Sequence, residues 1–407
     1  MSNQTLFLLK IETYPITMKK ILFALLICCM SYAQDVSLRS GTVREKNYYQ
    51  EIPIEIIMDK VIIPVVIEGT TYHFILDTGA PNLISKRIIK AINSKPIVKT
   101  AVRDGNTTKD SLDVINIPLI QLGNLNFENQ IAMVSDLENH PFLKCYGVDG
   151  LIGSNLFTNS ILKISLKDKK ITITDKIKTL SPQQKPKEMQ VIAAQGKPCI
   201  WIEYQGTEHK KVREQVLIDT GMDGFYDLSN RSYAFLKKEG IYQVIGKSVG
   251  VGDISLFGTG QQHEQELINI PFFKINQTTF NNVTTNTHEE RTSGIGLNFF
   301  KYGDGILDFI NKKFYWEEAE TTINMKPAEK FSCSYINNNY VVDFVWDETL
   351  KTKIKAGDVI IRIDQLNIKK MTTCDLLNLR KYLADKNTYE MEVQKEDTST
   401  VTVTISH

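Results

Sequence analysis

The sequence predicts a mainly β protein made of two related lobes, followed by a small α+β unit. Three observations lead to this prediction. An apolar triplet followed by Asp-Thr-Gly occurs twice, and the chain around both copies alternates apolar and polar residues as strands do. Residues 325–407 have a separate pattern of strands around one helix.

The repeated run places an Asp at the end of a β-type triplet and follows it with Thr and Gly. An ionised carboxylate at the end of a buried strand is costly unless it is paired or has a function. One such run is weak, because short motifs occur by chance, but a second copy makes chance a poor explanation. The first copy comprises Asp77, Thr78 and Gly79 after Phe74–Leu76, and the second comprises Asp219, Thr220 and Gly221 after Val216–Ile218.

Each copy is followed by a matching apolar-apolar-Gly segment. The spacing from Asp77 to Gly153 equals that from Asp219 to Gly296 to within one position. A repeat of about 142 residues is too long for a solenoid unit and indicates two related half-domains. The similarity continues through a later apolar strand and a basic turn, which are Ile161–Ile164 with Lys169 and Lys170 in one copy and Ile306–Phe309 with Lys312 and Lys313 in the other.

On these motifs the chain resembles the pepsin-like and retropepsin-like aspartic peptidases over roughly residues 50–318. The resemblance implies the bilobal acid-protease fold, with two β-barrel-like lobes and a substrate in the cleft between them. It implies Asp77 and Asp219 as the catalytic residues, one from each lobe. It also implies supporting roles, with cross-bonding hydroxyls at Thr78 and Thr220, close backbone approach at Gly79 and Gly221, and packing beneath the active loops at Gly153 and Gly296.

Residues 325–407 resemble a bacterial PDZ domain of the kind appended to peptidases. The similarity lies in the A-G-D-x-I-x-x-I run at 356–363, the helical spacing of 374–384 and two closing strands. PDZ domains hold an extended peptide or a C-terminus by β-augmentation. Residues 337–340 lack the family's glycine-bearing loop and 364–365 lack its Asn-Gly turn, so a structural cap is an equal alternative to peptide binding.

The pattern also predicts local elements around the two motifs. Residues 103–107 read as a hairpin tip, either a flap over the substrate or a plain turn, and the glycine-rich stretch 250–253 reads as a turn at the corresponding place. A short helix is expected over 85–92, and a meander over 113–134 with turns at 123–124 and 128–129. Polar linkers are expected at 176–190 and 317–330, which gives lobes at 34–180 and 188–318.

The N-terminal region predicts export. A basic start at Met18, an apolar run over 21–30 and small residues up to Ala33 form a secretory signal with cleavage after Ala33. The apolar run is too short for a stable membrane span. We therefore expect residues 1–33 to be an upstream extension and signal peptide, and the product to be a periplasmic or secreted monomer.

The remaining cysteines form no recognisable pattern. Four remain after the signal region, and they allow three pairings. Four free thiols are the favoured interpretation, and Cys333 with Cys374 is the pairing to test. The other two are Cys145 and Cys199.

The composition excludes several functions. With 42% hydrophobic and 23% charged residues and a net charge of +1, nothing indicates nucleic acid or an anionic membrane as a partner. The six His residues form no H-E-x-x-H motif, so no metal or other cofactor is expected. Asp149 could pass as catalytic, but termination of a loop is the favoured interpretation.

Two close Asp side chains suit peptide hydrolysis because they share one proton and so supply a base and an acid. Ala80 and Met222 stand where pepsin-like members often carry Ser or Thr, and Met222 could narrow or weaken the site. Losing a donor to the charged form should raise the upper pKa of the pair and move the activity optimum toward neutral pH. A pH profile with its maximum well below about pH 4 would contradict this hypothesis.

The sequence therefore predicts an exported aspartic endopeptidase acting on peptides or proteins, with a PDZ-like domain for a substrate or partner. The main alternative is a binding protein of the same fold that holds peptides without cleaving them. A third interpretation places the function in the PDZ-like domain, as an envelope scaffold.

Overall fold

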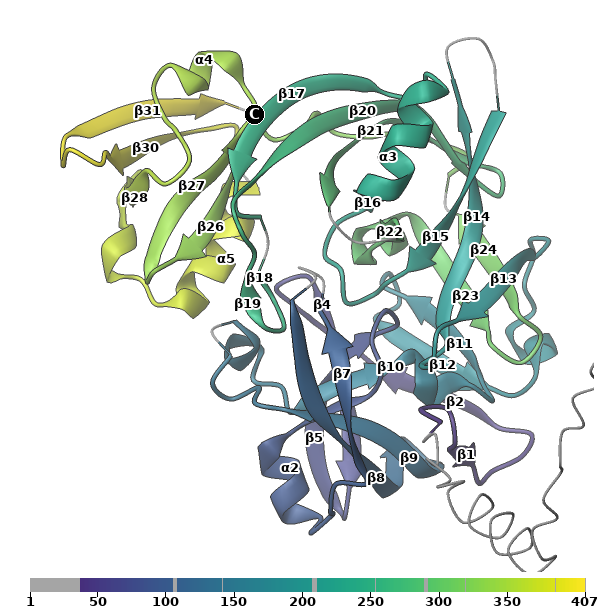
Figure 1. Cartoon of the computed structure of the whole chain (residues 1–407). Helices are drawn as coiled ribbons and strands as arrows, with labels where there is room; N and C mark the ends of the chain where they lie inside the picture. The colour runs from purple at the N-terminus through teal and green to yellow at the C-terminus, as the bar shows by residue number, and fades with distance from the viewer. Residues whose placement is uncertain are drawn as a thin grey trace, which may run out of the picture. The chain divides into compact units, whose positions relative to one another are not determined.

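The computed structural model describes residues 37–406 except 105–107, 141, 207–210, 253, 289–291, 319 and 385. These residues form three large sheets of nine, fourteen and six strands and a two-stranded one (Figure 1). The predicted fold class, mainly β with two acid-protease lobes followed by a small α+β unit, is confirmed. The predicted signal peptide lies outside the described residues.

The first lobe, residues 37–180, contains the nine-stranded sheet. Its strand order is β1-β9-β6-β10-β5-β4-β8-β7, with β3 paired to β4. Short turns of left-handed residues set the registers, such as Glu68 and Gly69 between β4 and β5. The elements are β1 (Thr42–Val43), β3 (Glu55–Ile57), β4 (Lys60–Ile67), β5 (Thr70–Asp77), β6 (Leu83–Ser85), α2 (Lys86–Ala91), β7 (Val98–Arg103), β8 (Lys109–Leu122), β9 (Leu125–Ser135) and β10 (Gly150–Gly153).

The fourteen-stranded sheet joins the first lobe to the second lobe, residues 187–324. Its order is β17-β20-β21-β16-β22-β15-β14-β13-β24-β23-β11-β12-β2, with β25 paired to β21. Its elements are β2 (Tyr49–Pro53), β11 (Ile161–Ser165), β12 (Lys170–Thr174), β13 (Lys187–Ile192), β14 (Lys197–Gln205), β15 (Lys211–Ile218), β16 (Tyr226–Ser229), α3 (Asn230–Lys238), β17 (Gln243–Gly250), β20 (His263–Ile275), β21 (Thr278–His288), β22 (Gly294–Ile295), β23 (Gly303–Asp308), β24 (Lys313–Glu318) and β25 (Thr322–Asn324).

The junction of the lobes is built from the repeated strands themselves. Strand β11 pairs with β23 in antiparallel register, with Ile161 opposite Asp308 and Ile164 opposite Gly305. These are the segments whose similarity marks the end of each repeat. One continuous hydrophobic core runs through both lobes beside this junction.

The tail unit, residues 325–406, has its own sheet and its own core. The strand order is β26-β27-β28-β30-β31, with β29 paired to β28 and with α5 contributing Leu376 and Leu379 to the core. Its resemblance to a PDZ domain stays a prediction. The elements are β26 (Phe331–Ile336), β27 (Asn339–Val345), α4 (Glu348–Lys351), β28 (Val359–Ile363), β29 (Leu366–Asn367), α5 (Thr373–Ala384), β30 (Thr388–Gln394) and β31 (Thr400–Ser406).

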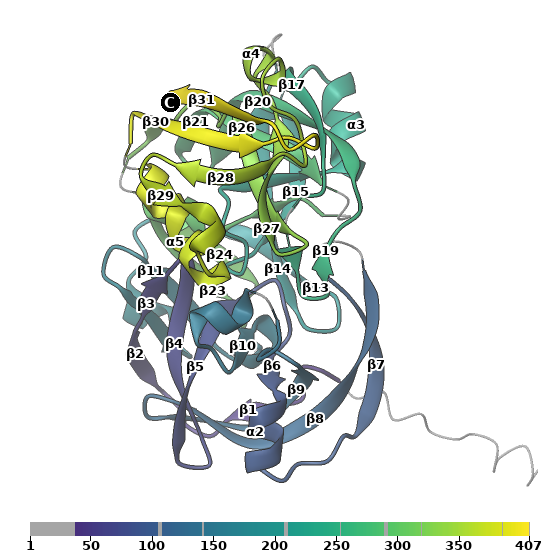
Figure 2. The ribbon, with the colours of Figure 1, turned by 90° about the vertical axis from the view of Figure 1, so that its left-hand side faces the viewer.

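Short elements complete the described chain. Strands β7 and β8 run side by side as a long hairpin (Figure 2), but its predicted tip falls on residues 105–107, outside the described residues. The two-stranded sheet lies between β17 and β20. It consists of β18 (Ile254–Ser255) and β19 (Gly258–Thr259). The described 3-10 helices span Leu143–Tyr146, Ser154–Phe157, Ile177–Leu180, Leu297–Tyr302 and Ile368–Lys370.

Three local expectations are wrong. No turn forms at 128–129, because β9 stays paired with β8 on both sides of Asn129, which adopts a positive φ of 53° within the strand. The linker 317–330 is partly strand, since β25 pairs with β21. The cysteines also differ from both interpretations, because Cys145 forms a disulfide with Cys374, while Cys199 is a buried thiol.

The described residues contain no helix that is long and apolar enough to cross a membrane.

Candidate active site

The two Asp-Thr-Gly loops start from equivalent strands. Asp77 is the last residue of β5, and Asp219 directly follows β15. Each strand is flanked by a short parallel strand from the apolar-apolar-Gly segment, β10 beside β5 and β22 beside β15. The parallel partner is buried, so each strand enters its loop from inside the core.

The loops face each other closely enough that only glycine fits at two positions. A Cβ added to Gly79 would lie 2.1 Å from Oδ2 of Asp219, and one added to Gly221 would lie 2.3 Å from Cγ of Asp77. Each glycine therefore packs directly against the opposite carboxyl group. The structure brings Asp77 and Asp219 together at the lobe junction, as the resemblance implies.

Two threonines bind the loops to each other in a reciprocal arrangement. The Thr78 hydroxyl donates to the Ile218 carbonyl at 2.7 Å, and the Thr220 hydroxyl donates to the Leu76 carbonyl at 2.8 Å. Each hydroxyl also accepts from the backbone N–H of the other threonine at 3.1 Å. Both side chains are fully buried, so these four bonds are shielded from water and fix the two loops relative to each other.

The Asp77 carboxylate accepts hydrogen bonds from its own loop. The backbone N–H groups of Gly79 and Ala80 both lie 3.0 Å from Oδ1 of Asp77, and the N–H of Gly221 lies 2.9 Å from Oδ1 of Asp219. The backbone of Ala80 thus supplies a donor at a position where the side chain has none. Both Asp residues keep partial exposure, so a water or a substrate can reach them.

The surroundings raise the pKa of Asp77 from 3.8 to about 7. Burial is the main cause, and the neighbouring Asp219 charge adds to it, because two adjacent carboxylates resist ionising together. The partly buried Lys60 ammonium and the Gly79 N–H act in the opposite direction. The direction is the one expected from the sequence, and burial is its largest cause.

Lys60 is a site residue that sequence analysis missed. It begins β4 in the first lobe, and its ammonium group contacts the Gly221 carbonyl and the Asp223 carboxylate in the second lobe. Burial is the largest single influence and lowers the pKa of Lys60, but the charge and hydrogen bond of Asp223, together with the nearby Tyr146 and Asp77, outweigh it, so the pKa is raised. The only sequence signal for this ion pair is Asp223, which lies close after the second Asp-Thr-Gly. Its partner Lys60 lies far away in the chain.

Glycines also support the loops from beneath. A Cβ on Gly153 would lie 2.3 Å from the Ala80 carbonyl oxygen, and one on Gly296 would lie 2.2 Å from the Gly224 carbonyl oxygen. The Met222 side chain lies against Gly294 and Gly296, because its Sδ and Cε are the atoms nearest to a Cβ at Gly294. Met222 therefore packs under its own loop.

Segments of the two lobes also contact each other at the ends of two hairpins, β7–β8 in the first lobe and β17–β20 in the second. The Phe257 N–H, in the turn between β18 and β19, donates to Oδ2 of Asp104 at 2.9 Å. Nε2 of His140, in the first lobe, lies 3.1 Å from the Ser255 carbonyl oxygen. The segment β18–β19, which forms the end of the second-lobe hairpin β17–β20, thus contacts the first lobe at two points.

Other candidate residues have structural partners. Asp149 is buried, pairs with Arg87 and accepts from the His73 N–H at 3.1 Å. It therefore holds the start of β10 against α2 and β5. Ser293, its counterpart, donates to the buried Glu214 at 2.5 Å. No group of His, Cys, Asp or Glu within the described part of the chain could hold a metal ion.

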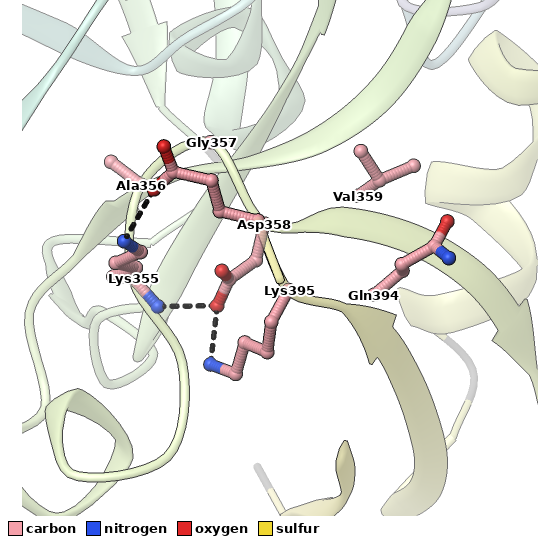
Figure 3. Close-up of a pocket in the computed structure, with 8 residues that line it drawn as sticks. Lys355, Ala356, Gly357, Asp358, Val359, Gln394 and Lys395 are labelled. Carbon is pink, nitrogen blue, oxygen red and sulfur yellow. Dashed lines mark hydrogen bonds and ion pairs between the residues drawn. The ribbon is translucent and has the colours of Figure 1, made fainter. Parts of the chain in front are cut away.

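A small pocket lies in the tail unit and not at the Asp pair (Figure 3). Lys355, Gly357 and Lys395 line it together with Asp358. The buried Asp358 carboxylate accepts from the Lys395 ammonium group at 2.6 Å and from the Lys355 N–H at 2.7 Å. These bonds hold the turn before β28.

Comparisons with known proteins found two similarities. Residues 63–156 match the family described as Aspartyl protease. Among solved structures, the aspartic proteinase from Irpex lacteus matches with 13% identity and a TM-score of 0.41, covering 67% of this chain and 98% of that one. No curated protein matches the chain. The family match, which spans Asp77 and the first apolar-apolar-Gly segment, supports an aspartic peptidase, and therefore a hydrolase.

Proposed function

We propose that the chain is an aspartic endopeptidase that hydrolyses peptide bonds with a water molecule activated between Asp77 and Asp219. The observation that carries this proposal is the packing of each loop glycine against the opposite Asp, locked by the threonine bonds. Carboxyl groups held this closely share one proton, so one is a base while the other is an acid.

The proposed mechanism needs no covalent intermediate. The ionised Asp takes a proton from the water as its oxygen attacks the scissile carbonyl carbon, while the protonated Asp hydrogen-bonds the carbonyl oxygen. The tetrahedral intermediate then collapses, the C–N bond breaks and the nitrogen receives a proton. Because the pKa of Asp77 is raised to about 7, the pair can hold its single proton at mildly acidic to neutral pH.

Cleavage within a chain is favoured by the meeting of hairpins from both lobes. The contact between Asp104 and Phe257 joins the two hairpins across the lobe junction. A substrate would lie between the lobes as an extended segment, with its chain continuing on both sides. This arrangement suits an endopeptidase better than an enzyme that removes terminal residues.

A fluorogenic peptide library tests the enzyme against a binding protein of the same fold. Asp77→Asn and Asp219→Asn should each reduce cleavage to background, whereas Asp136→Asn, at a surface carboxylate paired with Lys86, should leave it unchanged. If the wild type binds peptides and cuts none, the binding protein is the correct interpretation. Equal cleavage by the wild type and both Asn variants would refute the mechanism.

Export is the proposed route of the protein to its place of action. The Cys145–Cys374 disulfide supports it, because stable disulfides form mainly in oxidising compartments such as the periplasm or the extracellular space. Mass spectrometry of the protein from a secreting host should find a mature N-terminus at Gln34. A product that keeps residues 18–33 and stays in the cytoplasm would contradict export.

Peptide binding by the tail unit is a second candidate function. Strand β26 is at the edge of its sheet and pairs with β27 alone, so a peptide could add to it. Binding of C-terminal peptides to the full-length Asp77→Asn protein should be lost on Tyr335→Asp, in β26. No measurable binding by either protein would favour the structural cap.

A further inference from the structure

The second-lobe hairpin β17–β20 is held from outside by the tail unit. Strands β17 and β27 lie next to each other. The Val345 N–H donates to the Ser248 hydroxyl at 2.8 Å, and the Ser334 hydroxyl donates to the Gly252 carbonyl at 3.3 Å. The contact therefore joins residues on both strands of the tail hairpin β26–β27 to the strand and turn of the second-lobe hairpin.

One carboxylate lies at the centre of this contact. Asp343, in β27, is 4% exposed and accepts from the Val251 N–H at 2.6 Å and the Gly252 N–H at 3.0 Å. The two bonds use both carboxylate oxygens and cap two successive N–H groups where β17 ends. Hydrogen bonds to a charged acceptor are stronger than neutral ones, and burial strengthens them further.

Glycines on β17 fit the tail unit. A Cβ on Gly250 would lie 2.4 Å from Oδ1 of Asp343, and one on Gly246 would lie 3.2 Å from Trp346. A small apolar cluster of Leu267, Phe344 and Trp346 closes the contact. These glycines lie on the face of β17 that meets the tail, whereas Val249 on the alternate face is 44% exposed.

The tail unit is also fastened to the first lobe. The disulfide joins Cys374 in α5 to Cys145, and Phe142 packs edge to face on Tyr335 with ring centres 5.9 Å apart. The same first-lobe segment includes His140, which contacts the hairpin at Ser255. The tail unit is thus bonded to the second-lobe hairpin where β17 ends. It is also bonded to the first lobe, which the turn of the same hairpin contacts.

We propose that the tail unit positions the second-lobe hairpin for substrate binding, with Asp343 as the positioning residue and the disulfide as its anchor on the first lobe. This inference rests on the proposed function in so far as it concerns a substrate. Loss of the Asp343 carboxylate frees the Val251 and Gly252 N–H groups and lets the hairpin leave its place more often. The tail unit is then a support for the active site and not only an appended module.

Hydrogen exchange of the full-length oxidised protein tests the anchoring independently of catalysis. In Asp343→Ala, the amides of residues 243–263 should exchange at least about tenfold faster, because two charge-assisted hydrogen bonds are lost. The matched control is Asp347→Ala, which removes the N-cap of α4 from the Leu350 N–H and so weakens the tail without touching the hairpin. Equal exchange in the two variants would overturn the proposal.

Kinetics test the positioning. Asp343→Ala should raise KM for long peptides about tenfold with a smaller change in kcat, and Asp347→Ala should match the wild type. Gly250→Ala should reproduce the defect from the hairpin side, and the double variant should be no worse than either single one, since both break one contact. If the defects of Asp343→Ala and Gly250→Ala add up in the double variant, or if KM is unchanged in Asp343→Ala, the proposed positioning of the hairpin by the tail unit is overturned. If the wild type cleaves nothing, the proposed function fails while the exchange result still decides the anchoring.

Discussion

Replacing Asp77 by Asn should change how the stability of the protein depends on pH. The pKa of Asp77 is raised from 3.8 to about 7 by burial and by the Asp219 charge. Between these values the folded protein holds a proton that the unfolded chain releases, so stability falls as the pH rises through this window. At about 1.36 kcal/mol per pKa unit, the loss is about 4 kcal/mol between roughly pH 4 and pH 8.

Urea unfolding across this pH range measures the effect, and it needs no knowledge of a substrate. The free energy of unfolding of Asp77→Asn minus that of the wild type should grow by about 4 kcal/mol from pH 4 to pH 8, because groups remote from the Asp pair titrate alike in both proteins and cancel in the difference. Asp136→Asn should run parallel to the wild type. A difference between Asp77→Asn and the wild type that is constant over the range would refute the raised pKa, and with it the shared proton.

Three further variants probe the site and its supports. Lys60→Met removes a charge that lowers the pKa of Asp77, so the alkaline limb of kcat/KM should move up by about half a pH unit or more, and a downward shift would contradict this. Thr78→Ala should cost about 2–3 kcal/mol in urea unfolding while Thr78→Ser stays near wild type, since the two buried bonds, to the Ile218 carbonyl and from the Thr220 N–H, need only the Thr78 hydroxyl. Replacing Cys145 and Cys374 by Ser should cost up to about 5 kcal/mol, because the disulfide closes a loop with a sequence separation of 229, and unchanged thermal unfolding would speak against it.

The sequence predicts the active loops well because their determinants are local. An apolar strand, an Asp and a Thr-Gly turn are adjacent in the chain, and the matched spacing to Gly153 and Gly296 links each loop to the strand beside it. The helix expected over 85–92 also forms, as α2, because its start and its apolar face lie within one short segment. Short-range patterns report such elements directly.

Contacts between distant segments are what the pattern could not predict. Lys60 and Asp223 each read as an ordinary charged residue, and only folding places them together. Four cysteines allow three pairings, so Cys145 with Cys374 could not be selected without geometry. The glycines around position 250 were visible as a turn, but their reason is the Asp343 carboxylate from another unit.

The active site is a property of the lobe junction and not of either lobe. Thr78 finds its acceptor in the second lobe and Thr220 finds its acceptor in the first. Lys60 crosses the same boundary, and the pairing of β11 with β23 joins the repeats in one sheet. A half-domain alone would lose these bonds and expose its loop to water, and each bond contributes about 0.5–1.5 kcal/mol. The bonds that hold the two Asp residues close together are therefore the same bonds that join the two lobes.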